Sequence, residues 1–221
     1  MNRVVLYAGD PPLFIPTPFL HYDAIDNAGV GIHNPTATVW KDLAGNNDGT
    51  ITLGDGSRTE NKLKTTKTRV SFDSSGINLT EYTIFSIFSP VFTGTHPRLT
   101  AEPQFPTFYL SSGQSYAYGY FGQGIDTIFP WRILPIQNQV NYATFRCRNR
   151  KIELFVDWEN TGSALTPNIL PAGRNPAYLG ARDTNDRFLT GAYHSFRIYN
   201  RALTDEQIKQ LVLREKRRYP N

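Results

Sequence analysis

The sequence has little of what disulfide scaffolds, zinc proteins and membrane proteins depend on. It contains a single cysteine, Cys147, so no disulfide can form within the chain and the fold must be held by its core. No apolar run approaches the roughly 20 residues of a membrane-spanning helix. The histidines are scattered without zinc-ligand spacing, and nucleophile, phosphate-loop and dinucleotide motifs are absent. We therefore expect no membrane partner and no zinc or nucleotide chemistry.

A strong excess of one charge is also missing, since the formal net charge is only +4. The basic excess is concentrated in Arg214, Lys216, Arg217 and Arg218. These residues end a helical pattern, where cations offset the negative end of the helix dipole. We interpret them as a solvated helix end and expect no nucleic-acid partner.

The N-terminal stretch lacks the apolar segment of a signal peptide and instead contains Pro11, Pro12, Pro16 and Pro18. Prolines remove backbone donors and hold a chain extended. We expect residues 1–20 to form an extended proline-rich arm. No linker-like stretch divides the rest, so residues 21–221 are expected to form one domain.

What the sequence does contain is many short apolar or alternating runs separated by turn clusters. The runs include "RVSF", "YTIFSIFS", "YAYGYFG", "NYATFRC", "KIELFVDW" and "HSFRIYN". The turn clusters include "NNDGT", "GDGS", "DSSG", "RNRK" and "ENTGS". This pattern predicts an all-β fold, a two-sheet antiparallel jelly-roll sandwich.

Two runs predict which side chains are buried, because successive side chains of a strand point to opposite faces. In "KIELFVDW" one face would carry Ile152, Leu154, Val156 and Trp158, and the other Glu153, Phe155 and Asp157. In "TFRCRNR", Cys147 alternates with Arg146 and Arg148. We therefore predict a buried structural cysteine.

The chain ends in one helical pattern, predicted over about residues 204–217. Thr204 and Gln207 have capping-box spacing, and Asp205 and Glu206 suit the positive end of a helix. Ile208, Leu211 and Val212 form an apolar stripe at helical spacing. We expect this short amphipathic helix to cover an edge or end of the sandwich.

Two stretches resemble the laminin-G-like group of the concanavalin A-like lectin/glucanase superfamily. The first is "HYDAIDNAGVGIHNPTATVWKDLAGNNDGT", residues 21–50, and the second is "AYLGARDTNDRFLTGAYHSFRIYNRALTDEQIKQL", residues 177–211. The resemblance implies a concanavalin A-like jelly roll. It gives no activity by itself, because this fold hosts lectins, adhesins, glycanases and structural modules.

The glucanase branch that the resemblance brings in uses acids alternating along one strand, E-x-D-x-E. The matching positions here are Glu153, Phe155 and Asp157, so an aromatic stands where the pattern needs an acid. Hydration of the nearby turn explains Asp157 and Glu159. The sequence therefore predicts a protein without catalytic activity.

The strongest candidate for ligand binding is a tyrosine stripe on one strand face, Tyr116, Tyr118 and Tyr120, together with Trp131. Aromatic faces with polar tips stack on sugar rings, which favours a carbohydrate platform. The same stripe would equally fit the sandwich core or a subunit interface. These alternatives stay open at the level of sequence.

The loop "RDTNDR" offers the only candidate metal ligands, since laminin-G-like relatives often hold calcium at a loop rim. Asp183, Asn185 and Asp186 supply the oxygen ligands that calcium prefers. The alternative is a polar loop turned by its Asx side chains. No other cofactor is expected.

These features lead to the prediction of a bacteriophage virion protein, acting in capsid decoration or in fibre or tail attachment. Its expected partners are other virion proteins or identical subunits, with surface glycans at the loops, and its expected location is the virion. The alternative is a carbohydrate-binding or adhesion module of a secreted bacterial protein, located outside the cell or at its surface. A glycoside hydrolase is the third hypothesis.

Overall fold

The computed structural model describes residues 14–52, 58–59, 62–64, 68–78, 80–91, 100–101, 107–110, 116–120, 126–130, 138–165, 176–181 and 189–220. Its strands are β1 (Leu20–Asp23), β2 (Val39–Trp40), β3 (Gly49–Thr52), β4 (Arg58–Thr59), β5 (Lys62–Lys64), β6 (Arg69–Phe72), β7 (Tyr82–Pro90), β8 (Thr100–Ala101), β9 (Thr107–Leu110), β10 (Tyr116–Tyr120), β11 (Asp126–Pro130), β12 (Asn141–Arg148), β13 (Lys151–Val156), β14 (Glu159–Leu165), β15 (Ala177–Leu179) and β16 (Gly191–Tyr199). One helix, α1 (Asp205–Lys216), follows the last strand.

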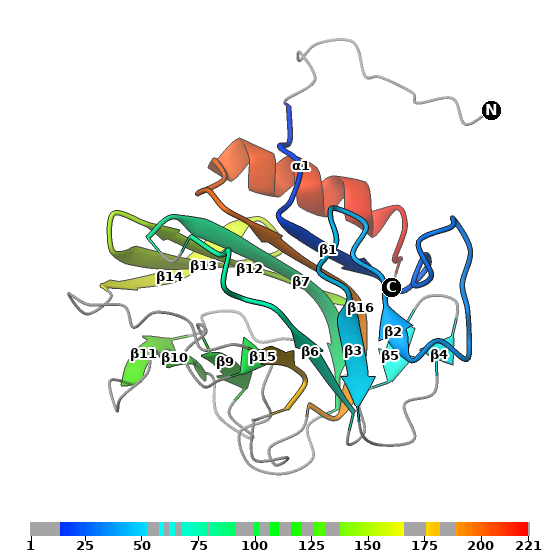
Figure 1. The fold of residues 1–221 in the computed structure, drawn as a ribbon. Helices are drawn as coiled ribbons and strands as arrows, with labels where there is room; N and C mark the ends of the chain where they lie inside the picture. The colour runs from blue at the N-terminus through cyan, green and yellow to red at the C-terminus, as the bar shows by residue number, and fades with distance from the viewer. Residues whose placement is uncertain are drawn as a thin grey trace.

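Two antiparallel sheets form the layers of a sandwich (Figure 1). The eight-stranded sheet has the order β14-β13-β12-β7-β16-β5-β4, and β1 also pairs with β16. The five-stranded sheet has the order β2-β3-β6-β15-β8. Strands β9, β10 and β11 form a further small sheet, and β9 contacts β8. The predicted all-β jelly-roll fold is confirmed.

The core between the two sheets is filled by alternate residues of their strands. The rings of Phe72 on β6 and Phe196 on β16 meet across it with centroids 6.1 Å apart. Ile152 and Leu154 of β13 are completely buried in the same core, as the alternation predicts. Cys147 is buried beside them, and burial raises the pKa of its thiol to about 11. The prediction of a structural cysteine is confirmed.

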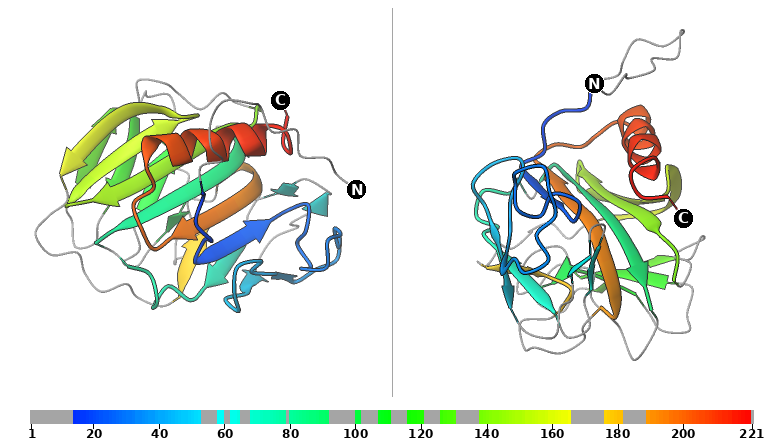
Figure 2. Two further views of the ribbon diagram at one scale, coloured as in Figure 1. Left: turned by 90° about the horizontal axis from the view of Figure 1, so that it is seen from above. Right: turned by 90° about the vertical axis from the view of Figure 1, so that its right-hand side faces the viewer.

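Helix α1 lies across the outer face of the eight-stranded sheet, and Figure 2 shows the same placement from two further sides. A second apolar cluster fills the space beneath it: Phe85, Ile87, Tyr142, Phe155, Tyr199, Leu203, Ile208, Leu211, Val212 and Tyr219. The prediction that the helix covers an edge or end of the sandwich is wrong. Phe155 and Tyr199 make the outer face apolar as well, so the face itself needs a cover.

The start of α1 is fixed by a cap and by a buried arginine. The Thr204 hydroxyl accepts a hydrogen bond from the Gln207 backbone N–H at 3.2 Å, and the Gln207 side chain accepts one from the Thr204 N–H at 2.9 Å. From β12, Arg146 Nη1 donates to the Leu203 carbonyl at 2.7 Å and lies 2.6 Å from Asp205 Oδ1. The predicted capping box is present.

No helix in the described part of the chain is long and apolar enough to cross a membrane.

The end of α1 is held by a cluster of Asp23, Arg197, Glu215 and Arg218, which we call the buried charge cluster because all but Arg218 are buried. Arg218 Nη1 lies 2.7 Å from Asp23 Oδ2 and 2.9 Å from Glu215 Oε2. Arg197 Nη2 lies 2.9 Å from Glu215 Oε1, and the Tyr219 hydroxyl donates to Asp23 Oδ1 at 2.8 Å. The prediction of a merely solvated helix end is wrong for Arg218, because this residue joins the helix to β1.

The alternation predicted for "KIELFVDW" fails at its end. Strand β13 stops at Val156, and Asp157 has a φ of 56°, so the chain turns before Trp158. Trp158 therefore packs against the cluster beneath α1, where the Lys216 ammonium lies 4.8 Å from its ring centre. Residues 1–13 lie outside the described residues, so the N-terminal arm stays a prediction.

Candidate functional site

The loop 41–48, which connects β2 to β3, is held by a carboxylate that points inward. Asp42 Oδ1 accepts hydrogen bonds from the backbone N–H groups of His21 and Ala44, each at 2.9 Å. Its Oδ2 accepts from the Asn47 N–H at 3.2 Å. Side-chain bonds of this kind fix a turn by replacing backbone partners. The loop is therefore shaped by its own sequence.

Asp48 completes the loop and stays ionised. Its Oδ1 accepts from the Asp42 N–H at 3.0 Å, and its Oδ2 pairs with the Lys41 ammonium. Burial alone would raise the pKa of the Asp48 carboxyl, but the hydrogen bonds from Lys41 and the Asp42 amide hold it below its usual value. Asp48 is therefore a hydrogen-bond acceptor at neutral pH.

Asn47 links the loop to Asp73, which follows β6. Its Oδ1 accepts from the Asp73 N–H at 2.9 Å, and its amide nitrogen donates to the Asp73 carbonyl. The Tyr22 hydroxyl donates to the Asn47 carbonyl at 2.6 Å, and the Tyr22 ring stacks on Trp40 with centroids 5.5 Å apart. These bonds tie the loop to β1 and to the end of β6.

An open groove of about 450 Å³ lies where this loop meets the five-stranded sheet. We call it the polar groove, and it is lined by Asn46, Asn47, Asp48, Thr50, Ser71, Phe72, Asp73 and Pro176. Amide, hydroxyl and carboxylate groups dominate this lining. Such groups bind a ligand by hydrogen bonds and fix its orientation.

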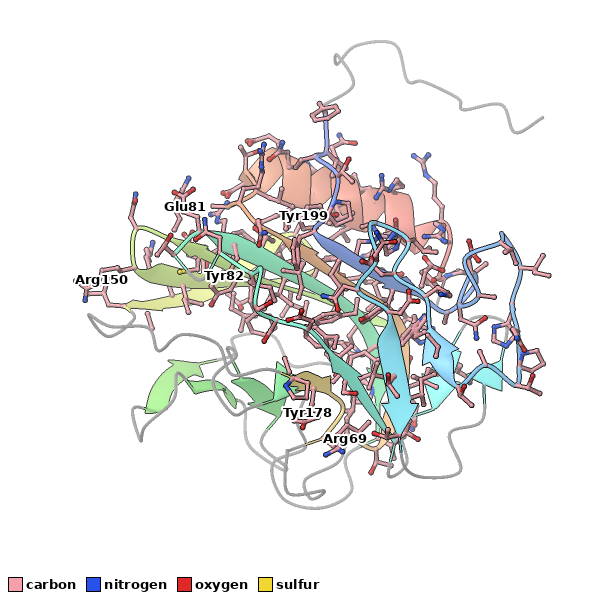
Figure 3. The ribbon with its side chains drawn as sticks, in the orientation of Figure 1. Arg69, Glu81, Tyr82, Arg150, Tyr178 and Tyr199 are labelled. Carbon is pink, nitrogen blue, oxygen red and sulfur yellow. The ribbon has the colours of Figure 1, made fainter. Side chains whose placement is uncertain are left out.

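Strand pairing places an aromatic ring beside the polar groove. Thr50 on β3 pairs with Ser71 on β6, and Ser71 pairs with Tyr178 on β15. Directly opposed residues share a sheet face, so these three form a row. The Arg69 guanidinium lies 4.4 Å from the centre of the half-buried Tyr178 ring. Figure 3 shows both side chains on the side of the sandwich away from α1.

The predicted tyrosine stripe cannot be assigned to the polar groove. Tyr116, Tyr118 and Tyr120 belong to β10, which pairs with β9 and β11. Their side chains and the whole of Trp131 lie outside what the structure describes. Their role in sugar binding stays a prediction.

The same outcome holds for the predicted calcium ligands. Asp183, Asn185 and Asp186 lie outside the described residues. Within the residues that are described, no group of three or more His, Cys, Asp or Glu side chains could hold a metal ion. The calcium prediction therefore stays untested.

The acids considered for catalysis have other partners. Glu153 is nearly buried, and its Oε2 lies 2.7 Å from Arg146 Nη2. Asp157 occupies the turn after β13 and lies 3.2 Å from the Lys216 ammonium. Glu159 is exposed at the start of β14. Glu153 thus belongs to the contact between the sheet and the helix.

The family of the chain follows from comparison with family models. A laminin-G-like model described as "Concanavalin A-like lectin/glucanases superfamily" matches residues 34–209. The chain belongs to this superfamily. The match includes loop 41–48 and every described residue that lines the polar groove. No curated protein matches this chain.

Solved structures show the same fold at low sequence identity. Domain 4 of AbnA, a GH43 extracellular arabinanase from Geobacillus stearothermophilus in complex with arabinotriose, has a TM-score of 0.70 and 16% identity, with 89% of this chain and 98% of that chain covered. A mutant of Trypanosoma rangeli sialidase displaying trans-sialidase activity has a TM-score of 0.68 and 12% identity, with 94% of this chain covered. The present chain spans only 35% of the length of that sialidase chain.

These similarities correct the functional prediction. The neighbouring structures include sialidases and an arabinanase domain holding a sugar, so the prediction of a bacteriophage virion protein is wrong. The alternative, carbohydrate binding, fits them better. The fold is shared by proteins that act on sugars and by a domain that holds one, and it decides nothing about catalysis.

The residues of the polar groove were missed at the level of sequence. The cluster "NNDGT" is typical of a turn, and Asn46 and Asp48 within it have no pattern that separates a binding loop from any other turn. Thr50, Ser71 and Tyr178 come from separate strands. Only the pairing of those strands brings them together.

Proposed function

We propose that this domain is a carbohydrate-binding module that acts without catalysis, and that the polar groove holds the sugar. The observation that carries this proposal is a preformed groove with hydrogen-bonding groups on its walls and an aromatic ring at its border. The complex of AbnA domain 4 with arabinotriose supports it, because the match covers nearly all of that domain.

The chemistry of the groove suits a sugar better than an apolar ligand. Asp48 accepts hydrogen bonds, the Thr50 and Ser71 hydroxyls donate and accept, and the Asn46 amide does both. A sugar ring also carries an apolar C–H face, which can pack against Tyr178. Because Asn47 and Asp42 fix the loop from within, little ordering is needed on binding.

Asn46 is the best position for testing sugar binding. It is exposed and lines the groove, so Asn46→Ala should leave the fold intact. Loss of its neutral hydrogen bonds, worth about 1 kcal/mol, should weaken binding roughly fivefold to tenfold. The measurement is calorimetric titration with arabinotriose, xylotriose and cellotriose, of which at least one should bind.

The matched control is Gln210→Ala, which removes the same amide group from the exposed surface of α1, on the other side of the sandwich. Gln210→Ala should bind with unchanged affinity. The proposal is overturned when none of the three trisaccharides binds, or when both variants bind as tightly as the parent.

The partners of the acids among the described residues speak against catalysis. A general acid for glycoside cleavage needs a raised pKa, whereas the pKa of Asp48 is lowered. The Glu153 carboxylate is already paired with the Arg146 guanidinium. We expect no reducing-sugar release from the trisaccharides above a blank without protein. Release that disappears in Asp48→Asn or Asp157→Asn would identify an enzyme instead.

A further inference from the structure

A second open groove, of about 500 Å³, lies beside the first. We call it the loop groove, and its lining includes Asp26, Ala28, Lys41, Asp42, Asn46 and Asp48. Asn46 and Asp48 line both grooves, so they form a ridge between them. Each groove lies within the range of roughly 300 to 1,000 Å³ that is usual for small-molecule sites.

The ridge between the grooves is fixed in place. Asp48 is held on one side by the Asp42 amide and on the other by the Lys41 ammonium. Asp42 in turn accepts three backbone hydrogen bonds, from His21, Ala44 and Asn47. The spacing of the grooves is therefore set before any ligand arrives, which lowers the entropy lost on binding.

The charge of the two linings is unbalanced among the residues that the structure describes. The carboxylates of Asp26, Asp42, Asp48 and Asp73 line the grooves, and Lys41 is the single basic residue in either lining. In the loop groove, Asp26 and Asp42 add negative charge beyond the Lys41–Asp48 pair, so an acidic sugar would meet like charge there, whereas uncharged hydroxyl groups would find acceptors. The lining of the loop groove thus favours neutral sugars.

We propose that the two grooves are adjacent subsites of one extended site for a neutral oligosaccharide, with its chain crossing the ridge at Asn46 and Asp48. The polar groove, bordered by Tyr178, takes the first sugar residue, and the loop groove takes a residue linked to it. Linkage makes the second contact intramolecular, so it strengthens binding without a separate loss of translational freedom. This inference rests on the proposed function of the polar groove.

The experiment compares monosaccharides with trisaccharides on the full chain. Arabinose is titrated against arabinotriose, xylose against xylotriose and glucose against cellotriose. In a pair that binds, the trisaccharide should bind at least tenfold more tightly. A further pair, lactose and 3′-sialyllactose, tests charge, and the sialylated sugar should bind no more tightly than lactose.

Two variants separate the grooves. Ala28 lines only the loop groove, so Ala28→Gln should obstruct that groove and reduce the trisaccharide affinity to that of the monosaccharide, which stays unchanged. Ser71 lines only the polar groove, so Ser71→Gln should weaken both sugars about tenfold. Circular dichroism checks that each variant folds. Where Ala28→Gln does not fold, Asp26→Asn replaces it, with about threefold weaker trisaccharide binding and unchanged monosaccharide binding expected.

The outcomes distinguish the two proposals. When no sugar binds, the proposed function fails and the inference fails with it. When sugars bind but trisaccharide and monosaccharide are equal, or when Ala28→Gln weakens both alike, the binding function stands and the extended site is overturned. Tighter binding of 3′-sialyllactose than of lactose would overturn the preference for neutral sugars.

Discussion

Replacing Arg197 with methionine is expected to lower the free energy of unfolding by about 3 kcal/mol. Arg197 lies on β16 beneath the helix and is almost completely buried. Its Nη2 is 2.9 Å from Glu215 Oε1 and 3.9 Å from Asp23 Oδ2. Removing this cation leaves the buried carboxylates of Asp23 and Glu215 with less positive charge beside them. Methionine fills the volume without replacing the charge.

The carboxylates of this buried charge cluster are ionised in the folded protein. Burial alone would raise the pKa of both groups, but His21 and Arg218 hold the pKa of Asp23 below its usual range. Arg197 and Arg218 do the same for Glu215. The folded state therefore depends on their partners, and losing Arg197 exposes the desolvation that its charge offsets.

Urea unfolding followed by fluorescence or circular dichroism measures the change. The matched control is Arg214→Met, since Arg214 Nε also lies 3.1 Å from Glu215 Oε1 but its side chain is 53% exposed. An exposed ion pair of this kind is worth about 0 to 1 kcal/mol. Equal losses for the two variants would contradict the view that burial of Arg197 makes the difference.

The sandwich itself could be predicted from the sequence, because strand alternation is a local signal. Ile152, Leu154 and Val156 recur at every second position and are buried between the sheets. The two family-like stretches, 21–50 and 177–211, include β1 to β2 and β15 to β16 together with much of α1. Both stretches contribute strands to the same sandwich.

The position of the helix could not be predicted, because charged residues interrupt the apolar outer face of the sheet. Glu153 and Arg197 occupy outward positions of their strands and read as a solvated face. In the fold they are buried, since Glu153 pairs with Arg146 and Arg197 pairs with Glu215. Partners distant in sequence neutralise these charges, and no local pattern reports such pairing.

The candidate site could not be predicted from the sequence for a related reason. Asn46 and Asp48 were predicted to lie in a turn, and both lie in the loop between β2 and β3. What makes them a groove wall is the bond from Asn47 to Asp73 and the pairing of Ser71 with Tyr178. Those contacts depend on strand register, which the sequence specifies only through the complete core.

Replacing Gly191 with alanine is expected to lower the free energy of unfolding by about 4 kcal/mol, from backbone strain and overpacking together. Gly191 begins β16 opposite Pro90 of β7 and has a φ of +143°. A Cβ atom there would lie 2.2 Å from the Ser89 carbonyl oxygen and 3.0 Å from Pro90 Cα. Because the obstructing atoms belong to the backbone, the two central strands must separate locally.

The matched control is Gly31→Ala, which shares the positive φ but not the close approach. Gly31 has a φ of +80°, and a Cβ atom there would meet nothing within 4 Å. Its replacement should therefore show backbone strain alone, about 1 kcal/mol. In thermal unfolding, Gly191→Ala should lower the midpoint by roughly 10 °C and Gly31→Ala by roughly 3 °C. If the two midpoints fall equally, the close approach of Gly191 to the Ser89 carbonyl is not what makes this position sensitive.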